Sequence, residues 1–143
     1  MALLVEDPLA HRALESLLRA ETAVRRRLSG ELQREGLSAS GFSVLVVLHT
    51  ADGELPLRAL RRRLGTSKAN ATEIVTTLEA QQLVRRSRSD RDRRAVTITL
   101  APRGREIVDR LFPDHAGRVR DAFAVLDEQE KRSLASICRK LAA

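Results

Sequence analysis

Apolar side chains recur at helical spacing along the first third of the chain. Over residues 9–35 they fall at steps of three and four, which is the pattern of one face of a long amphipathic helix. That stripe consists of Leu14, Leu17, Leu18, Val24, Leu28 and Leu32. Ser38 or Ser40 can cap a second helix, and the turn signal at residues 51–53 ends it.

Two shorter helical patterns follow, separated by Gly65. Pro56 can open the first, in which leucines face inward while Arg58 and residues 61–63 face outward. Ser67 can cap the second, over residues 68–80, whose apolar stripe is Ala71, Ile74, Val75 and Leu78. Two short helices joined by a glycine-containing turn predict a helix-turn-helix, with the second as the recognition helix.

The spacing then changes from helical to alternating. Val96, Ile98 and Leu100 alternate with threonines, and the run LVRRSR precedes them across a charged tip at residues 89–93. Alternation on both sides of a polar turn predicts a β-hairpin. A basic hairpin directly after a recognition helix is the wing of a winged helix.

Two helices are predicted after the hairpin. Pro102 fits the first turn of one, and Pro113 should kink or interrupt it; its apolar face is Ile107, Val108, Leu111 and Phe112. Asp127 and Glu130 form a capping signal for the last helix, which carries Leu134, Ile137, Cys138 and Leu141. The expected fold is mainly α with a small β-hairpin wing. It is one domain, residues 1–143, in which a winged helix-turn-helix at 52–101 is inserted between helical segments 8–51 and 102–143.

Charge is concentrated in the middle of the chain. The net charge is +7 over 143 residues, and residues 51–105 carry thirteen basic against six acidic side chains while both flanks are neutral. Arginine supplies 23 of the 26 cations and suits bidentate contact with phosphate and guanine. An arginine-rich surface without a ligand would explain the choice of arginine but not the neutral flanks. We therefore expect an anionic partner.

Composition excludes several other classes of function. Aromatic residues make up only 2%, which disfavours stacking on single-stranded bases. The single Cys138 rules out an intramolecular disulfide framework and favours the cytoplasm, and no signal peptide or membrane span is found. His11, His49 and His115 lie far apart in sequence, so no metal site is predicted. Without a phosphate loop or a nucleophile–base set, we expect neither an enzyme nor a cofactor.

Three segments together resemble the MarR family of bacterial and archaeal transcription regulators. They are LPLRALRRRLGTSKANATEIVTTLEAQQLVRR, SDRDRRAVTITLAPRG and LDEQEKRSLASICRKL, and the resemblance extends from about residue 8 to 142. The wing pattern of the family maps onto Asp92 and Arg94, and its LVxR strand onto Leu83, Val84 and Arg86. Two departures are visible: Gln82 replaces the usual glycine after the recognition helix, and Ala101 replaces a capping threonine.

The resemblance implies a homodimer, joined through the N- and C-terminal helices, that binds pseudo-palindromic double-stranded DNA. Such regulators are usually repressors, released by a small phenolic or anionic effector or by thiol oxidation. The effector pocket is expected between the dimerisation helices and the winged helix. Two recognition helices also double the number of bases that one can read. The terminal apolar stripes could instead pair within one chain.

The exposed face of the recognition helix supplies candidates for the major groove. They are Ser67, Lys68, Asn70, Thr72, Glu73 and Thr76. Lys68 can reach guanine or phosphate, Asn70 can pair with adenine, and Glu73 can accept from cytosine. The threonines can offer hydroxyl or methyl contacts. The alternative is an ordinary solvated helix face, on which Glu73 would only repel phosphate.

The wing supplies a second set. Arg91 and Arg93 are expected in the minor groove, Asp92 and Arg94 in an ion pair that shapes the tip, and Arg86 and Arg88 on phosphates. The run at 61–63 is equally well explained as a solvated face. Cys138 is a redox candidate, although its apolar helix stripe favours an inert core thiol.

A second function remains open at this point. A winged-helix interaction module could keep the fold and use its basic lobe for an acidic protein or a membrane surface. Steeply salt-dependent binding to duplex DNA would separate the two.

Overall fold

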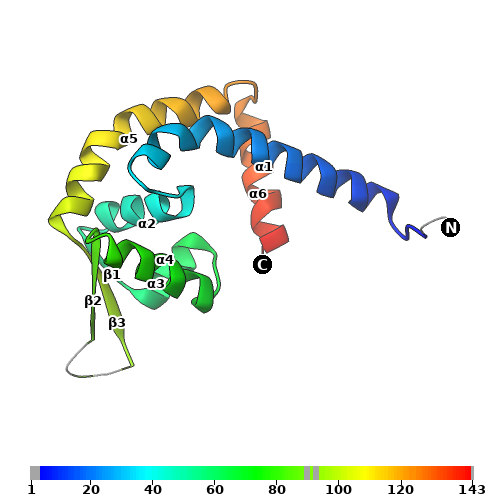
Figure 1. Cartoon of the computed structure of the whole chain (residues 1–143). Helices are drawn as coiled ribbons and strands as arrows, with labels where there is room; N and C mark the ends of the chain where they lie inside the picture. The colour runs from blue at the N-terminus through cyan, green and yellow to red at the C-terminus, as the bar shows by residue number, and fades with distance from the viewer. Residues whose placement is uncertain (1–3, 89–90, 92–93, 143) are drawn as a thin grey trace.

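The computed structural model describes residues 4–88, 91 and 94–142, and it is mainly helical with one small sheet (Figure 1). In chain order the elements are α1 (Pro8–Arg34), α2 (Ala39–Thr50), β1 (Glu54–Pro56), α3 (Leu57–Leu64), α4 (Lys68–Ala80), β2 (Val84–Arg88), β3 (Val96–Leu100), α5 (Pro102–Ala122) and α6 (Glu128–Ala142). The winged helix-turn-helix predicted from the pattern is confirmed.

Helices α2 and α6 begin at side-chain caps that the sequence supplies, whereas α3 and α5 begin without a side-chain cap. The hydroxyl of Ser38 accepts from the backbone N–H of Gly41 at 3.0 Å, which selects Ser38 over Ser40 as the cap of α2. Before α6, Asp127 accepts from the N–H of Glu130 at 2.8 Å, and Glu130 accepts from the N–H of Asp127 at 3.1 Å. This reciprocal pair is the predicted capping box. Both satisfy donors that the first turn of a helix leaves without partners.

The sheet has one more strand than the hairpin predicted. Its order is β1-β3-β2, all antiparallel, with Leu55 opposite Ile98 and Arg86 opposite Ile98 on the other side. Pro56 was expected to open a helix, but it ends β1, and α3 begins one residue later. Because β1 is an edge strand, the missing N–H of proline removes no bond from the sheet interior.

At Pro113 the structure contradicts one of the two expected outcomes, the interruption of the helix. Helix α5 runs unbroken from Pro102 to Ala122 with that proline inside it. Ion pairs on both sides of Pro113 join α5 to α1: Arg110 contacts Glu35 at 2.7 Å, and Arg118 contacts Glu31. Packing and these contacts hold the helix where its own hydrogen bonding is interrupted.

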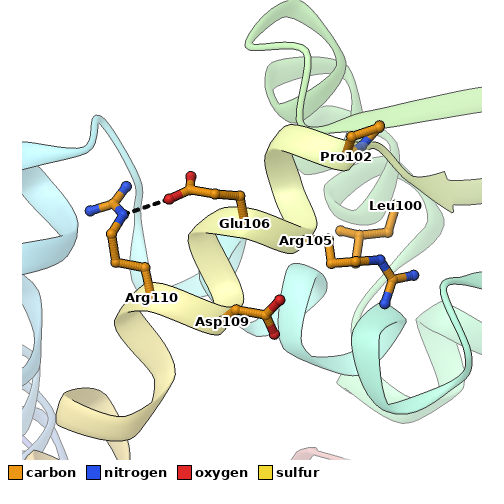
Figure 2. Close-up of a pocket in the computed structure, with 6 residues that line it drawn as sticks. All are labelled: Leu100, Pro102, Arg105, Glu106, Asp109 and Arg110. Carbon is orange, nitrogen blue, oxygen red and sulfur yellow. Dashed lines mark hydrogen bonds and ion pairs between the residues drawn. The ribbon is translucent and has the colours of Figure 1, made fainter.

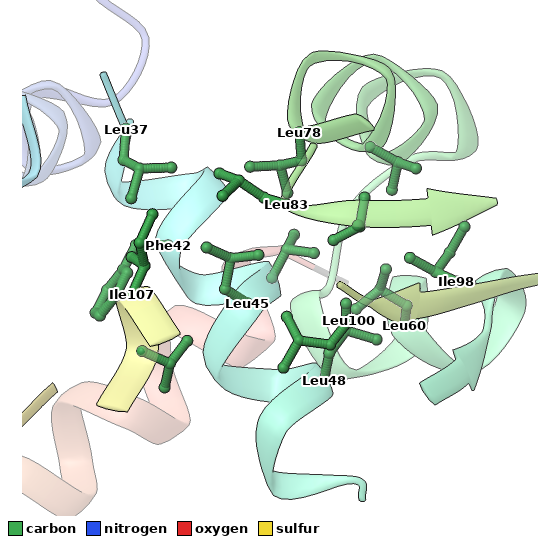
Figure 3. Packing of buried hydrophobic residues seen from close by; sticks show 14 of the residues in the cluster. Leu37, Phe42, Leu45, Leu48, Leu60, Leu78, Leu83, Ile98, Leu100 and Ile107 are labelled. Atoms are coloured by element: carbon green, nitrogen blue, oxygen red, sulfur yellow. The ribbon is translucent and has the colours of Figure 1, made fainter. Parts of the chain in front are cut away.

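The core surrounds α2. Figure 3 shows its side chains meeting those of α3, α4, β3 and α5; the labelled residues are Leu37, Phe42, Leu45, Leu48, Leu60, Leu78, Leu83, Ile98, Leu100 and Ile107. All are buried. Phe112, which was expected on the apolar face of α5, is 41% exposed and lies outside this core.

The N-terminal part of the apolar stripe on α1 and the stripe on α6 are not covered within the described chain. Leu14 is 51% exposed and Leu18 56% on α1, and Ile137 is 61% exposed on α6. Leu32 is the buried residue of α1, and α6 has none among its described residues. In Figure 1 the N-terminal half of α1 extends away from the rest of the molecule. Within one chain, these exposed residues of α1 and α6 therefore do not pair with each other.

Candidate nucleic-acid interface

The turn between α3 and α4 aims one face of α4 outward. Gly65 ends α3 in the left-handed conformation with φ of 63°, and Ser67 caps α4 by accepting from the N–H of Asn70 at 3.1 Å. Ala71, Val75 and Leu78 are buried against the core. Because side chains repeat every three to four residues on a helix, the opposite face of α4 must point to solvent.

Five of the six residues predicted for the major groove lie on that exposed face. They are Ser67, Lys68, Asn70, Glu73 and Thr76. Thr72 is half-buried, so its side chain projects less than the sequence pattern suggested. The Asn70 Nδ2 donates to the hydroxyl of Thr66 at 2.6 Å, which orients the amide at the start of the helix.

The described part of the wing is basic and exposed. Arg86 and Arg88 lie on β2, and Arg91 and Arg94 lie between the strands; all four are exposed. Asp92 and Arg93 lie outside the described residues. The ion pair of Asp92 with Arg94 and the minor-groove role of Arg93 therefore stay predictions.

Two hydrogen bonds that sequence reasoning did not find join the wing to α4. The backbone N–H of Arg86 donates to Glu79 Oε2 at 3.1 Å, and Arg86 Nη2 donates to Thr76 Oγ1 at 2.8 Å. The only signal in the sequence is that Thr76 and Glu79 are three residues apart and so share a helix face. Their partner is ten residues from Thr76 along the chain and is brought there by the fold.

The arginine run on α3 divides into two kinds of position. Arg62 and Arg63 are exposed as expected, but Arg61 is half-buried in a groove of about 360 Å³ between α3 and β3. Its Nε has no hydrogen-bond partner among the described residues. Lys68 and Arg94 line the same groove. The positive charge of the lobe thus continues from α3 to the wing.

Figure 2 shows a broad groove along the first turns of α5, where the charges balance. Its lining includes two arginines and two acids, and the Nε of Arg110 donates to Glu106 at 2.8 Å. Asp109 also contacts His49 Nε2 at 2.9 Å. A surface on which the charges of arginines and acids cancel has little net attraction for a polyanion, so this groove is not part of the basic face.

A smaller apolar pocket lies between α2 and α5. It has a volume of about 290 Å³ and is lined by Val46, His49, Thr50, Val108, Asp109, Phe112 and Pro113. The His49–Asp109 pair is its polar feature, and the ring of Phe112 is partly open to solvent. An apolar pocket with one polar pair suits a small ring compound that carries a polar substituent.

The packing of α5 against α1 and α2 shifts two pKa values. The hydrogen bond from Arg110 lowers the pKa of Glu35 below 4.5. Burial lowers the pKa of His115 below 6.5, and the nearby Arg118 lowers it further. The imidazole packs edge-on against Phe42 with 4.8 Å between ring centroids, and its Nδ1 is buried without a hydrogen-bond partner in the described chain.

Metal and membrane sites find no support in the described ranges. No three His, Cys, Asp or Glu side chains gather there as metal ligands would. Among the same residues, no helix combines the length and the apolar character that crossing a bilayer requires. Cys138 is exposed rather than buried in a core of its own chain.

Comparison with known proteins agrees with this geometry. A sequence profile of the MarR family matches residues 37–96. The uncharacterized HTH-type transcriptional regulator YwaE of Bacillus subtilis is 30% identical over 129 residues, which cover 89% of this chain and 74% of that protein. The transcriptional repressor MprA of Escherichia coli is 30% identical over 111 residues, covering 77% of this chain and 63% of that protein.

A solved structure of a DNA complex has the same fold. Sco3205, a MarR family transcriptional regulator from Streptomyces coelicolor in complex with DNA, superposes with a TM-score of 0.77 at 28% identity. The match covers 99% of this chain and 89% of that one. By sequence and by fold, the chain belongs to the MarR family of DNA-binding transcription regulators, and not to a family of enzymes.

Proposed function

We propose that the protein is a homodimeric, ligand-responsive repressor that binds a pseudo-palindromic operator in double-stranded DNA. One observation carries the DNA part of the proposal. The exposed face of α4 lies beside a wing with exposed arginines, and both belong to the segment that holds the whole net charge of +7. A helix that presents polar side chains next to a basic hairpin matches the width and charge of a major groove and its phosphates.

The uncovered apolar stripes support a dimer. Exposed leucines and isoleucines on α1 and α6 form surfaces that a monomeric protein in water rarely presents; they are Leu9, Leu14, Leu17, Leu18, Leu134, Ile137 and Leu141. The segments 1–50 and 106–143 are each electrically neutral, so a second copy of this chain meets no charge repulsion there. We assign residues 8–51 and 102–143 to the dimerisation lobe and 52–101 to the DNA-binding lobe.

DNA binding is tested by selecting duplexes from a random library and measuring affinity against salt. If the dimer contacts about 6–10 phosphates, affinity for the selected operator should fall about 10³–10⁵-fold between 50 and 200 mM salt. A protein that prefers no duplex over random DNA contradicts the proposal. Tight binding to acidic peptides or anionic vesicles, without such preference, would favour the interaction module instead.

The pocket between α2 and α5 supports the effector part. All of its lining residues belong to α2 and α5 of the dimerisation lobe. Because the other side of α2 packs against α3, α4 and β3, an occupant of the pocket would act on the DNA-binding lobe through α2. A screen of phenolic acids should find compounds that release the operator and raise the melting temperature. His49→Ala should lose this response, while His11→Ala, far away on the exposed face of α1, should keep it. Release that is equal in both variants would place the effector elsewhere.

The direction of regulation follows from the same experiment in cells. The relative MprA is named as a repressor, and a dimer that covers two half-sites blocks polymerase most simply. We therefore expect higher expression from the selected operator when the gene is deleted. Lower expression on deletion would indicate an activator. A chromosome-binding regulator acts in the cytoplasm, which is where we place the protein.

A further inference from the structure

The hydroxyl of Thr76 makes two hydrogen bonds within the protein, one as donor and one as acceptor. Its Oγ1 donates to the backbone carbonyl of Thr72 at 2.8 Å and accepts from Arg86 Nη2 at 2.8 Å. A threonine hydroxyl has one hydrogen and two lone pairs. Its only hydrogen is therefore used within α4, and it cannot also donate to a base.

The hydrogen bond from Arg86 makes the Thr76 oxygen a weaker acceptor for any further donor. A guanidinium that draws on one lone pair withdraws electron density from the oxygen, so the other lone pair attracts a further donor less. The two bonds also fix the side-chain rotamer, since threonine in a helix chooses between rotamers by the bond of its Oγ1 to the preceding turn. The group left to meet a base is the methyl.

Arg86 occupies a position that sets this arrangement. Its backbone N–H is held by Glu79 Oε2 at 3.1 Å, and β2 pairs with β3 on its other side, so the main chain at this residue is fixed with respect to α4. From there the guanidinium reaches back to Thr76. Arg86 was expected only to contact phosphate. The geometry shows that it also holds the side chain of Thr76 through a hydrogen bond.

We infer that Thr76 reads a thymine in each half-site through contact between its methyl and the C5 methyl of the base, and that Arg86 is the positioning residue that selects this contact. The inference rests on the proposed binding of duplex DNA and specifies which of the possible threonine contacts is made. The major groove presents a methyl group only at thymine, so the contact distinguishes T from C.

The test uses the full-length protein and the operator selected from the library. Each thymine is replaced in turn by deoxyuracil, which removes only the C5 methyl, symmetrically in both half-sites. For the unmodified protein, one position should lose affinity by about 3–5-fold per half-site, which is the contribution of one buried methyl. Affinities are measured by fluorescence anisotropy at fixed salt.

Two variants at residue 76 separate methyl from hydroxyl. Thr76→Ser keeps the hydroxyl and removes the methyl, and it should bind the thymine and deoxyuracil operators equally well at that position. Thr76→Val has methyl groups at both γ positions and a strongly preferred rotamer in a helix, so a methyl stays in place without the bond from Arg86, and this variant should retain the discrimination. The inference is overturned if the serine variant still prefers thymine over deoxyuracil, or if the valine variant no longer does.

The positioning role has its own control. Arg86→Ala should lower affinity for all duplexes and also reduce the deoxyuracil effect at that thymine. Arg88→Ala, on the same strand, should lower affinity but leave the effect intact. If Arg86→Ala leaves it intact as well, the positioning role is wrong. A library that returns no preferred duplex defeats the regulator proposal itself, whereas an operator in which no thymine depends on residue 76 defeats only this inference.

Discussion

Gly104 of α5 lies directly against the backbone carbonyl of Leu83, so closely that a side-chain carbon at residue 104 would overlap that oxygen. The same carbonyl accepts from the N–H of Ala101 at 3.0 Å. Leu83 immediately precedes β2, and Ala101 immediately precedes α5. This junction sets where α5 leaves the winged helix.

Replacing Gly104 by alanine should therefore destabilise the protein. The added methyl must displace backbone rather than a flexible side chain, and such overpacking costs about 1–3 kcal/mol. Gly30→Ala is the matched control, because apart from its chain neighbours and the nearby backbone of α1 nothing lies within 4 Å of the added carbon, and alanine is the better helix former. Urea unfolding followed by circular dichroism measures both. Equal stability of the two variants would contradict the close contact.

Gln82 carries backbone strain that glycine should relieve. Its φ is 62°, in the left-handed region that costs a side-chain-bearing residue about 1–2 kcal/mol. Gln82→Gly should raise the free energy of unfolding by about 0.5–1 kcal/mol, part of the gain being offset by the greater freedom of glycine in the unfolded chain. Ala80→Gly, two residues earlier in α4, should lower it instead. A stabilising effect at both positions would exclude strain as the cause.

His115 should make stability depend on pH in the range near neutrality. Its folded pKa is lowered below the ordinary 6.5, so the unfolded state binds the proton more readily. The stability that neutral His115 contributes is fully present above pH 6.5 and is lost as pH falls through the lowered pKa. His115→Gln should flatten this part of the profile, whereas His11→Gln, at an exposed position, should not. Thermal melts between pH 5 and 8 measure how stability depends on pH. A steeper loss of stability toward low pH in the His115 variant would contradict this role of His115.

The dimer proposal predicts the effect of a charge on α6. Ile137→Glu places a carboxylate in the apolar stripe and should convert the protein to a monomer of 15.9 kDa, observed by light scattering. Ser136→Glu adds the same charge on the opposite side of the helix and should leave the dimer intact. Cys138 belongs to the stripe, so its thiol should react faster with Ellman's reagent in the monomeric variant. An Ile137 variant that stays dimeric would place the interface elsewhere.

Short-range features were predictable from the sequence because their causes are local. Ser38, Ser67 and the Asp127–Glu130 pair cap their helices by bonds that span three residues. Strand β1 was missed because three residues carry no periodic signal, and its partner β3 is more than forty positions away. The contact of Arg86 with Thr76 depends likewise on how β2 meets α4.

The apolar stripes mark a limit of a different kind. The spacing of Leu14, Leu17 and Leu18 identifies which face of α1 is apolar, and that was correct. It does not say what covers the face. The structure leaves these leucines exposed within one chain, so their partner must be argued from charge and exposed area.

Helix α5 runs unbroken through Pro113 and connects the wing side of the molecule to α1. Its 21 residues span about 32 Å at 1.5 Å per residue. Its first end is held by Leu83 beside the wing. Arg110 ties the middle of the helix to Glu35, and Arg118 ties its C-terminal half to Glu31 of α1. If the helix moves as one body, a tilt of about 5° at the α1 end moves the wing end by about 3 Å over that length. This displacement is about the length of a hydrogen bond between an arginine and a phosphate.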